Sequence, residues 1–429
     1  MNRVCLTLPT NRACSATITA LHAEAAYAAR HFDADVQLLI LDSADDRTRA
    51  EHTRTVAALP AHQGVTVHHY DEEAQRDFLR RLIRKAGLPQ PDRLLHLMLP
   101  PAVSYGACTN RAFLLAAALG CDSVHRRDSD STYQLHAGQP VFPVHHELPW
   151  LGRPAADASA GVTRTDLDPA LAHRPVSLAG ASFIGELSVD IGEIRRLDQA
   201  VYHDVVSLWA PGDWPEDRTR ALVEESFTGA GTAPFTGDHS TLTLVDPMRV
   251  DMCNVAFDRA VYERVPLPPA TDTIGSDYFL LHLVHDAGLP GILHNRHIEN
   301  FHTPERRTDT GFPAYQRRFV KFLLSMLYFH DVYDRMAAEG AGLLDGRHHV
   351  RADAVTGFLR ESTGLDRTEN IWRLDRVDTA YRKLGGRYAA FADQLAADRA
   401  RLLDEAEQDI ASFADLIEAW PALMEATRP

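Results

Sequence analysis

Residues 104–130, SYGACTNRAFLLAAALGCDSVHRRDSD, contain the pattern that decides the fold. Their alanine- and leucine-rich part, residues 106–119, predicts a helix that ends at Gly120. Residues 123–127 predict a short strand, which stops at the acidic triplet DSD of positions 128–130. A helix that leads straight into a strand is typical of α/β proteins, whose ligands bind outside the carboxyl ends of the strands. The triplet is therefore the first candidate for a binding site.

The sequence on either side extends this pattern. Strands are expected over residues 3–8, 36–41, 65–70, 176–189, 241–245 and 291–301, and helices over residues 15–30, 45–59, 73–86, 191–209, 258–264 and 276–287. The strict alternation in the first third predicts parallel strands with helices on both faces of the sheet. From about residue 304, apolar stripes at helical spacing continue to the end of the chain. The fold class is therefore α/β with a C-terminal all-helical extension.

The composition limits the classes of partner that the protein can bind. Asp and Glu number 59 against 44 Lys and Arg, a formal net charge of −15. Such a surplus argues against nucleic acid as a partner and against electrostatic docking on an anionic membrane. We expect no membrane span and no cleavable leader, and the 5 scattered cysteines predict free thiols rather than disulfides. A cytoplasmic protein is the simplest interpretation.

The acidic triplet offers two carboxylates close together in the chain. Asp128 and Asp130 can share one divalent cation, one directly and one through water, and a hard ion such as Mn²⁺ or Mg²⁺ suits oxygen ligands. The alternative is an ordinary turn, because Asp and Ser are common in loops. The spacing of the two acids leaves both interpretations open.

The wider context resembles a known family. Residues 104–113, Gly120 and the triplet, in this order, resemble the middle of family-2-like GT-A glycosyltransferases, in which a strand ends at a metal-binding Asp-x-Asp. The resemblance implies a GT-A (Rossmann-like) mixed sheet and a nucleotide-sugar site. It assigns that site to the loop after the first strand, to the ends of the second and third strands, and to the helix and triplet: Pro9, Thr10, Asn11, Arg12, Asp42, Asp71, Asn110, Arg111 and Ser129.

Two later segments are similar to the same family. Residues 251–259 look like its acceptor-side strand and short helix, which places Asn254 among the acceptor-binding residues. Residues 274–281 resemble its Gly-Glu-Asp stretch, but Ser276 replaces the first acid, so Asp277 alone is the candidate catalytic base.

The resemblance also supplies candidates for the metal and the acceptor. His302 stands where many such enzymes place a third metal ligand beside the two aspartates of the triplet. The polar cluster His145, His146 and Glu147 is typical of an acceptor- or sugar-facing loop, and equally of a packed turn.

The function that the resemblance implies is metal-dependent transfer of a hexose-like unit from a GDP- or UDP-linked sugar to a small-molecule acceptor. The triplet region looks nearer to mannosylglycerate-synthase-like enzymes, and inversion and retention at the anomeric carbon both stay open. Residues 1–305 are expected to form the catalytic domain, with a nucleotide-binding half at 1–133 and an acceptor-binding half at 134–305. Residues 306–429 are expected to form a helical domain that packs on the catalytic domain or makes a homodimer.

Two alternatives come from other classes of protein. A non-catalytic binding or scaffold protein of the same fold would not turn over a nucleotide sugar. A sugar-phosphate nucleotidyltransferase usually opens with a glycine-rich loop, which residues 8–12 lack. The composition, rich in Arg with lysine only at Lys85, Lys321 and Lys383, is typical of an actinobacterial protein, and a role in secondary metabolism fits that context.

Overall fold

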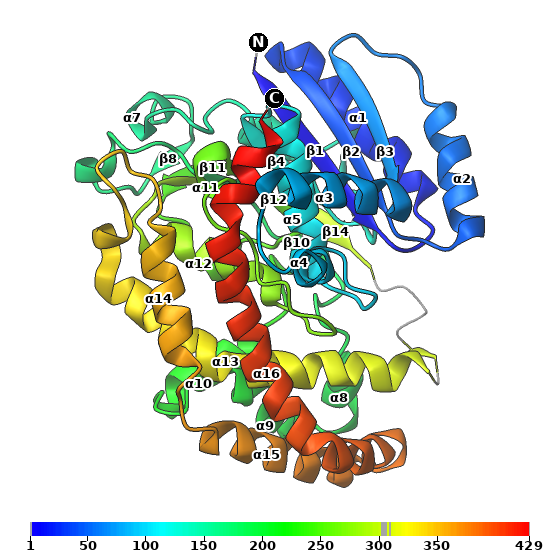
Figure 1. The fold of residues 1–429 in the computed structure, drawn as a ribbon, viewed down its shortest axis with the longest axis vertical. Coiled ribbons are helices and arrows are strands. Elements are labelled where there is room, and N and C mark those ends of the chain that lie inside the picture. Colours follow the sequence, from blue (N-terminus) through cyan, green and yellow to red (C-terminus); the bar gives the residue numbers. More distant parts are fainter. Residues whose placement is uncertain (1, 302–306, 309, 429) are drawn as a thin grey trace.

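The computed structural model describes residues 2–301, 307, 308 and 310–428. Within these residues, nine strands form one twisted sheet in the order β3-β2-β1-β4-β12-β9-β13-β11-β8 (Figure 1). The strands are β1 (Arg3–Thr10), β2 (Asp35–Asp42), β3 (Val65–Asp71), β4 (Ser123–Arg127), β8 (Arg164–Thr165), β9 (Leu178–Gly180), β11 (Ser240–Thr243), β12 (Asn254–Asp258) and β13 (Gly291–His294).

The main sheet is mixed. Strands β3, β2, β1 and β4 are parallel, whereas β12 runs antiparallel to both of its neighbours, β4 and β9. Beside the main sheet lie a small sheet of β10 (Phe183–Gly185), β14 (Ile298–Asn300) and β5 (Ser131–Tyr133), and a hairpin of β6 (Leu135–His136) and β7 (Gln139–Pro140).

The helices cover both faces of the main sheet and then form the C-terminal region (Figure 1). They are α1 (Ser15–Phe32), α2 (Asp46–Ala57), α3 (Glu72–Ala86), α4 (Pro91–Met98), α5 (Tyr105–Ala118), α6 (Val144–Glu147), α7 (Ala155–Ala158), α8 (Gly192–Leu197), α9 (Gln199–Val206), α10 (Glu216–Glu225), α11 (Arg259–Tyr262), α12 (Phe279–Asp286), α13 (Gly311–Glu339), α14 (Ala352–Ser362), α15 (Thr368–Leu384) and α16 (Gly386–Thr427).

The alternation of side chains along β1 and β2 explains why both faces carry helices. Leu6 and Leu38 belong to the apolar cluster under α1, whereas their chain neighbours Cys5 and Leu39 belong to the larger cluster under α3 and α5. Because successive residues of a strand point to opposite faces, strands that are apolar throughout must be covered twice. The predicted α/β class with helices on both faces is confirmed.

The middle of the chain differs from the prediction in its details. The single strand expected over residues 176–189 is two strands, β9 and β10, in different sheets, and the strand expected over 291–301 divides in the same way into β13 and β14. Helices α4 and α10 were not predicted. Short strands that change sheet are set by which partner edges are available, and sequence periodicity does not contain that information.

The C-terminal helices pack directly on the α/β part. One apolar cluster extends from Phe113 of α5 to Phe413 and Trp420 of α16. Trp420 is fully buried, and its indole N–H donates to the carbonyl oxygen of Tyr262 at 3.0 Å. Figure 1 shows α16 running from the end of the molecule where α15 lies to the side of the main sheet. The expected all-helical extension is confirmed, and the domain boundary at residue 305 stays a prediction.

None of the described helices combines the length and the apolar character that crossing a membrane requires.

Trp420 provides a test of this packing. Trp420→Ala should lower the free energy of unfolding by about 3–5 kcal/mol, because it leaves a cavity between α16 and the α/β part and removes an indole hydrogen bond. The measurement is urea unfolding followed by circular dichroism. Trp372→Ala is the control, since Trp372 on α15 is 48% exposed, and a loss of under about 1 kcal/mol is expected there. Equal losses in the two variants would contradict the described packing.

Candidate active site

A cleft of about 740 Å³ opens at the carboxyl ends of β1 and β4. One wall is made by the loop Pro9–Arg12 after β1, by residues 99–104 before α5, and by the triplet after β4. The opposite wall is made by residues from the second half of the chain, including Asp251 and Asp277, and by side chains of α12 and α13. This is the place at which an open α/β sheet binds its ligands.

The first turn of α5 lies close to the second half of the chain. Ser104 caps this helix by accepting a hydrogen bond from the backbone N–H of Ala107 at 3.2 Å. Gly106 lies so near to the carbonyl of Pro268 that a Cβ atom there would be 1.9 Å from the carbonyl oxygen. Only glycine permits this approach, which closes the base of the cleft.

The carboxylates of the triplet point into the cleft and are held by arginines. The guanidinium of Arg12 donates to Asp130 Oδ2 at 2.6 Å, and Arg126 lies 3.1 Å from Asp128 Oδ1. The backbone is tied as well, since the Ser131 hydroxyl donates to the carbonyl oxygen of Asp128 at 2.9 Å. The loop after β1 and the end of β4 are thus joined by charge-assisted contacts.

Arg126 also joins the two walls. It is 3% exposed, and its Nη1 donates to Asp277 Oδ2 at 2.6 Å. Asp277 lies in a 3-10 turn, Ser276–Tyr278, that begins at Gly275 with φ of 72° and leads into α12. Arg126 therefore places the candidate base opposite the triplet, although the two are far apart in the sequence.

The cleft holds more carboxylates than the nearby arginines balance. Burial is the largest of the effects that raise the pKa of Asp128 to about 6; the charges of Asp130, Asp251 and Asp277 act in the same direction, and Arg126 opposes them. The phenol of Tyr278 donates to Asp251, which holds that carboxylate at the same wall. A group of acids that repel one another in a half-enclosed space attracts a cation.

The residues present fit a divalent cation at the triplet. Asp128 and Asp130 offer hard carboxylate oxygens. Burial, and after it the charges of Asp130, Asp251 and Asp277, raise the pKa of Asp128, and a cation would balance those charges. His302, the third predicted ligand, lies outside the described residues. Arg12 and Arg126 contact these carboxylates in the described structure, so both contacts would have to open for a cation to bind.

A buried ionic network holds the end of β4, directly before the triplet. Arg127 donates to both carboxylate oxygens of Glu24 on α1, at 2.9 and 3.1 Å, and to Glu147 of α6 at 2.9 Å. His125 contacts Glu147 at 2.7 Å, and the phenol of Tyr133 donates to Glu24 at 2.5 Å. Burial raises the pKa of Glu147, but Arg127 and His125 lower it by more, so that it stays below its usual range. Glu147 thus supports the end of β4 from the face opposite the cleft.

The structure places the predicted nucleotide-binding residues in two groups. Pro9, Thr10, Asn11, Arg12, Arg111 and Ser129 line the cleft. Arg111 is buried and donates to Gln75 at 2.7 Å and to the carbonyl oxygen of Met98 at 2.7 Å, which positions the loop before α5.

The other three predicted nucleotide-binding residues, Asp42, Asn110 and Asp71, do not line the cleft. Asp42 is fully buried between His52 and His69, each at 2.9 Å, while its neighbours Leu41 and Ser43 line the cleft. Asn110 is fully buried and exchanges two hydrogen bonds with the backbone of Leu267. Asp71 caps α3 through the N–H of Ala74 at 2.8 Å.

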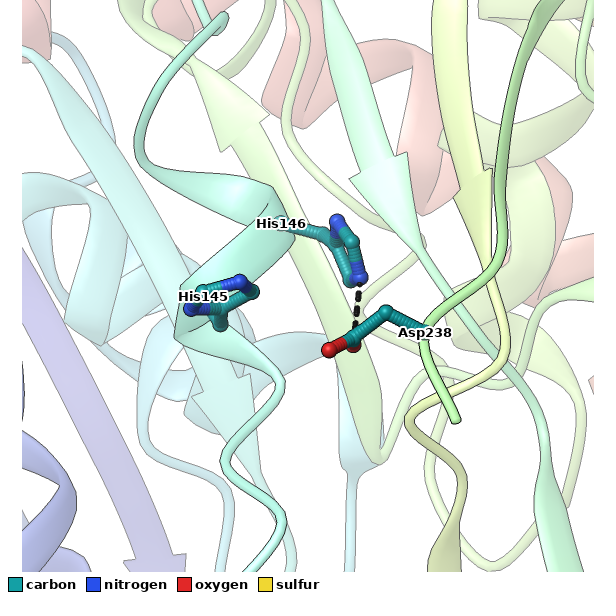
Figure 2. A group of neighbouring side chains, drawn as sticks. All are labelled: His145, His146 and Asp238. Carbon is teal, nitrogen blue, oxygen red and sulfur yellow. Dashed lines mark hydrogen bonds and ion pairs between the residues drawn. The ribbon is translucent and has the colours of Figure 1, made fainter. Parts of the chain in front are cut away.

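The predicted acceptor residues also lie apart from the cleft. His146 contacts Asp238 at 2.9 Å (Figure 2), and His145 contacts Tyr27 at 2.7 Å. Their ring nitrogens and the Asp238 carboxylate lie within 4.8 Å of one another, close enough to share a metal ion. However, Arg296 already holds both oxygens of that carboxylate, at 2.6 and 2.9 Å. Asn254 is fully buried, and its amide donates to the carbonyl oxygens of Ser182 and Arg296.

Sequence reasoning missed Arg126, Asp251 and Tyr278 as site residues. The signal for Arg126 was present, because two successive arginines in a strand expected to be buried must each find a carboxylate. Asp251 and Tyr278 had no comparable signal, since their contact joins residues on separate segments.

Comparison with known proteins gives one sequence family and several distant structures. A family model described as a family of unknown function (DUF6271) matches residues 2–429, and no curated protein matches the sequence. The chain is similar to glucosyl-3-phosphoglycerate synthase from Mycobacterium tuberculosis in complex with Mn²⁺, UDP and phosphoglyceric acid, at 17% identity and a TM-score of 0.35 over 76% of this chain and 78% of that chain. It is also similar to the mannosyltransferase PcManGT from Pyrobaculum calidifontis in complex with GDP-Man and Mn²⁺, at 13% identity and a TM-score of 0.37 over 97% and 86% of the two chains.

The buried network under the triplet gives a prediction on stability. Glu24→Gln puts an amide N–H₂ in place of a carboxylate oxygen that accepts hydrogen bonds from Arg127, Tyr133 or the Val144 N–H. The free energy of unfolding should fall by about 3 kcal/mol, since buried donors then face another donor. Urea unfolding measures this loss. The control is Glu216→Gln, whose side chain is 81% exposed in its pair with Arg220; a change below about 1 kcal/mol is expected there. A loss as small as that of the control would show that the network does not stabilise the fold.

The raised pKa of Asp128 gives a prediction on pH. Its folded-state pKa of about 6 lies above the ordinary value of 3.8 for an aspartate side chain, so the ionised carboxylate destabilises the folded, metal-free protein. Relative to Asp128→Asn, the wild type should therefore lose on the order of 2–3 kcal/mol of stability as the pH rises from about 4 to about 7. Chemical unfolding in EDTA at several pH values measures the difference. Parallel pH profiles for the two proteins would contradict the described environment of Asp128.

Proposed function

The chain belongs to a family of unknown function (DUF6271), and we propose that it is a metal-dependent glycosyltransferase of the GT-A type. It would move a sugar from a GDP- or UDP-linked donor to a small-molecule acceptor. One observation supports this most: a single cleft collects the loop after β1, the acidic triplet after β4 and Asp277.

The donor would lie along the wall formed by the N-terminal part of the chain. The loop Pro9–Arg12 and the residues before α5 line that wall, next to the triplet. The guanidinium of Arg12 is suited to a diphosphate, to which it can donate two parallel hydrogen bonds. Asp128 and Asp130 would hold Mn²⁺ or Mg²⁺, and the bound ion would neutralise negative charge that develops on the leaving diphosphate.

Asp277 would act on the acceptor side. A carboxylate at this wall can accept the proton of an attacking hydroxyl in an inverting reaction, or position that hydroxyl in a retaining one. In the described structure Asp277 accepts a hydrogen bond from Arg126 at 2.6 Å. This contact supports the positioning role, because a base must leave its ion pair before it can take up a proton.

The rival interpretation within the same fold is a binding protein without activity. Two of the four acids support an enzyme over this rival. A site that only binds a diphosphate with its metal ion uses Asp128 and Asp130 but gains nothing from Asp251 and Asp277, which lie close enough to Asp128 to add to the effect of burial in raising its pKa.

Calorimetric titration with UDP and with GDP, each with Mn²⁺ and with EDTA, tests the proposal. One nucleotide should bind the wild type only with Mn²⁺, and Asp130→Ala should weaken it at least about tenfold, a loss of ~1.4 kcal/mol. Asp46→Ala is the control, because the Asp46 side chain is 94% exposed on α2, and it should bind like the wild type. A folded wild type that binds neither nucleotide would contradict the proposal.

A further inference from the structure

The acceptor-side wall of the cleft carries a cluster of aromatic rings beside Asp277. Trp209 and Phe227 are stacked with ring centroids 5.3 Å apart, and Trp209 meets Phe322 of α13 edge-on at 5.6 Å. All three residues line the cleft. We call Trp209, Phe227 and Phe322 the aromatic platform.

The platform is held directly against the turn that carries Asp277. Gly275, two residues before Asp277, approaches Phe322 so closely that a Cβ atom there would lie 2.8 Å from the ring. A group bound on the platform would therefore lie next to Asp277, the carboxylate that contacts the acceptor hydroxyl in the proposed function.

Phe227 is held in an unusual backbone conformation. Its φ is 64°, in the left-handed region that a bulky residue rarely adopts. Strain of this kind costs on the order of 1–3 kcal/mol and is retained where the surrounding structure requires it, often at ligand sites. Here it presents the Phe227 ring to the indole of Trp209 rather than leaving it in solvent.

The rest of this wall is apolar or negatively charged. Among the residues of this wall that line the cleft, six acids outnumber the arginines Arg218 and Arg318; the acids are Glu225, Asp246, Asp251, Asp277, Asp286 and Asp334. Arg249 pairs with Glu225 at 3.2 Å and with Asp246 at 3.8 Å, so the surplus of negative charge lies with the other four acids. Arg218 lies over the ring of Trp214 at 3.4 Å, where its charge is directed to an aromatic face. An anionic group on the acceptor would meet a surplus of like charge here.

Two of the three histidines that line this wall supply no positive charge. The third, His285, hydrogen-bonds Asp286 at 2.9 Å, which raises the pKa of His285 and sets its charge against that carboxylate. Burial and the charge of His285 lower the pKa of His282 to about 3, and its ring stacks on Tyr333 at 3.8 Å. Burial, Arg373 and His282 lower the pKa of His330 to about 3. Both imidazoles are therefore neutral at physiological pH and add to the apolar, ring-lined character of the wall.

From these features we propose that the acceptor is an aromatic alcohol or amine without an anionic group, and that its ring stacks on the aromatic platform. This proposal rests on the proposed function for its use of Asp277, but binding of the ring depends only on the platform and on the charge of the wall. A sugar acceptor would need several hydrogen-bonding side chains around its hydroxyls, and Trp209, Phe227 and Phe322 provide one N–H between them.

Three small molecules test the contributions of the aromatic ring, the charge and the hydroxyl groups separately. Tyramine carries a phenol ring and a positive charge, 3-(4-hydroxyphenyl)propionate carries the same ring and a negative charge, and glycerol has hydroxyls without a ring. Calorimetry and quenching of tryptophan fluorescence report binding to the full-length wild type, without nucleotide and with UDP or GDP and Mn²⁺. Tyramine should bind at least tenfold more tightly than the propionate, and glycerol should not bind measurably.

Variants test whether the platform is the site. Trp209→Leu and Phe322→Leu should each weaken tyramine at least about fivefold and leave binding of nucleotide with Mn²⁺ unchanged, whereas Trp372→Leu, on the exposed face of α15, should change neither. Circular dichroism checks the fold of each variant. Asp286→Asn is a further variant that keeps the platform intact, and it should narrow the preference for tyramine over the propionate.

The outcomes distinguish this proposal from the proposed function. Nucleotide binding without tyramine binding, or equal binding of tyramine and the propionate, would overturn the acceptor proposal alone. Tyramine binding that depends on Trp209, in a protein that binds no nucleotide, would support a ring-binding site and overturn the glycosyltransferase proposal.

Discussion

Two adjacent arginines at the end of β4 determine how the rest of the site is built. Because neighbouring residues of a strand point to opposite faces, Arg126 points to the cleft side and Arg127 to the α1 side. Each guanidinium is buried and needs a carboxylate, and the partners come from distant parts of the chain: Asp277 for Arg126, and Glu24 and Glu147 for Arg127. Ion pairs on both faces of the sheet thus hold the end of β4, and they position the acidic triplet that follows it.

The surplus of acids in the cleft has a consequence for what can bind there. A chain with a net charge of −15 has no general attraction for a phosphorylated ligand. The cleft shows the same surplus locally, since the charges of neighbouring carboxylates add to the effect of burial in raising the pKa of Asp128. A diphosphate can enter such a site only if a cation and a few well-placed arginines reverse the local field, which is the role proposed for the triplet and Arg12.

The C-terminal helices do more than cover the sheet. Helix α13 supplies Phe322 to the aromatic platform. Helix α16 contacts α12 through Phe413 and Phe279, whose ring centroids lie 4.8 Å apart, and Phe279 in turn contacts Phe329 of α13 at 6.0 Å. The acceptor-side wall is therefore assembled from the irregular middle of the chain and from the helical region together. The helical region therefore packs on the sheet and also lines the cleft.

The sequence by itself determined the elements of the first third other than α4, the position of the triplet at a strand end and the helical character after residue 310, because these depend on local periodicity, caps and breaker residues. The resemblance to GT-A glycosyltransferases, rather than periodicity, pointed to Arg12 and Ser129, and both line the cleft.

Only the tertiary structure decided what lies behind the cleft wall and what faces it. Asp42 and Asn110 occupy positions that look functional in the sequence, but long-range partners, His52 and Leu267, bury them. Conversely, Arg126 and Asp277 meet across 151 residues of chain, and no local pattern reports such a contact. Burial and charge pairing are properties of distant neighbours, and those neighbours exist only once the sheet and the helices have packed.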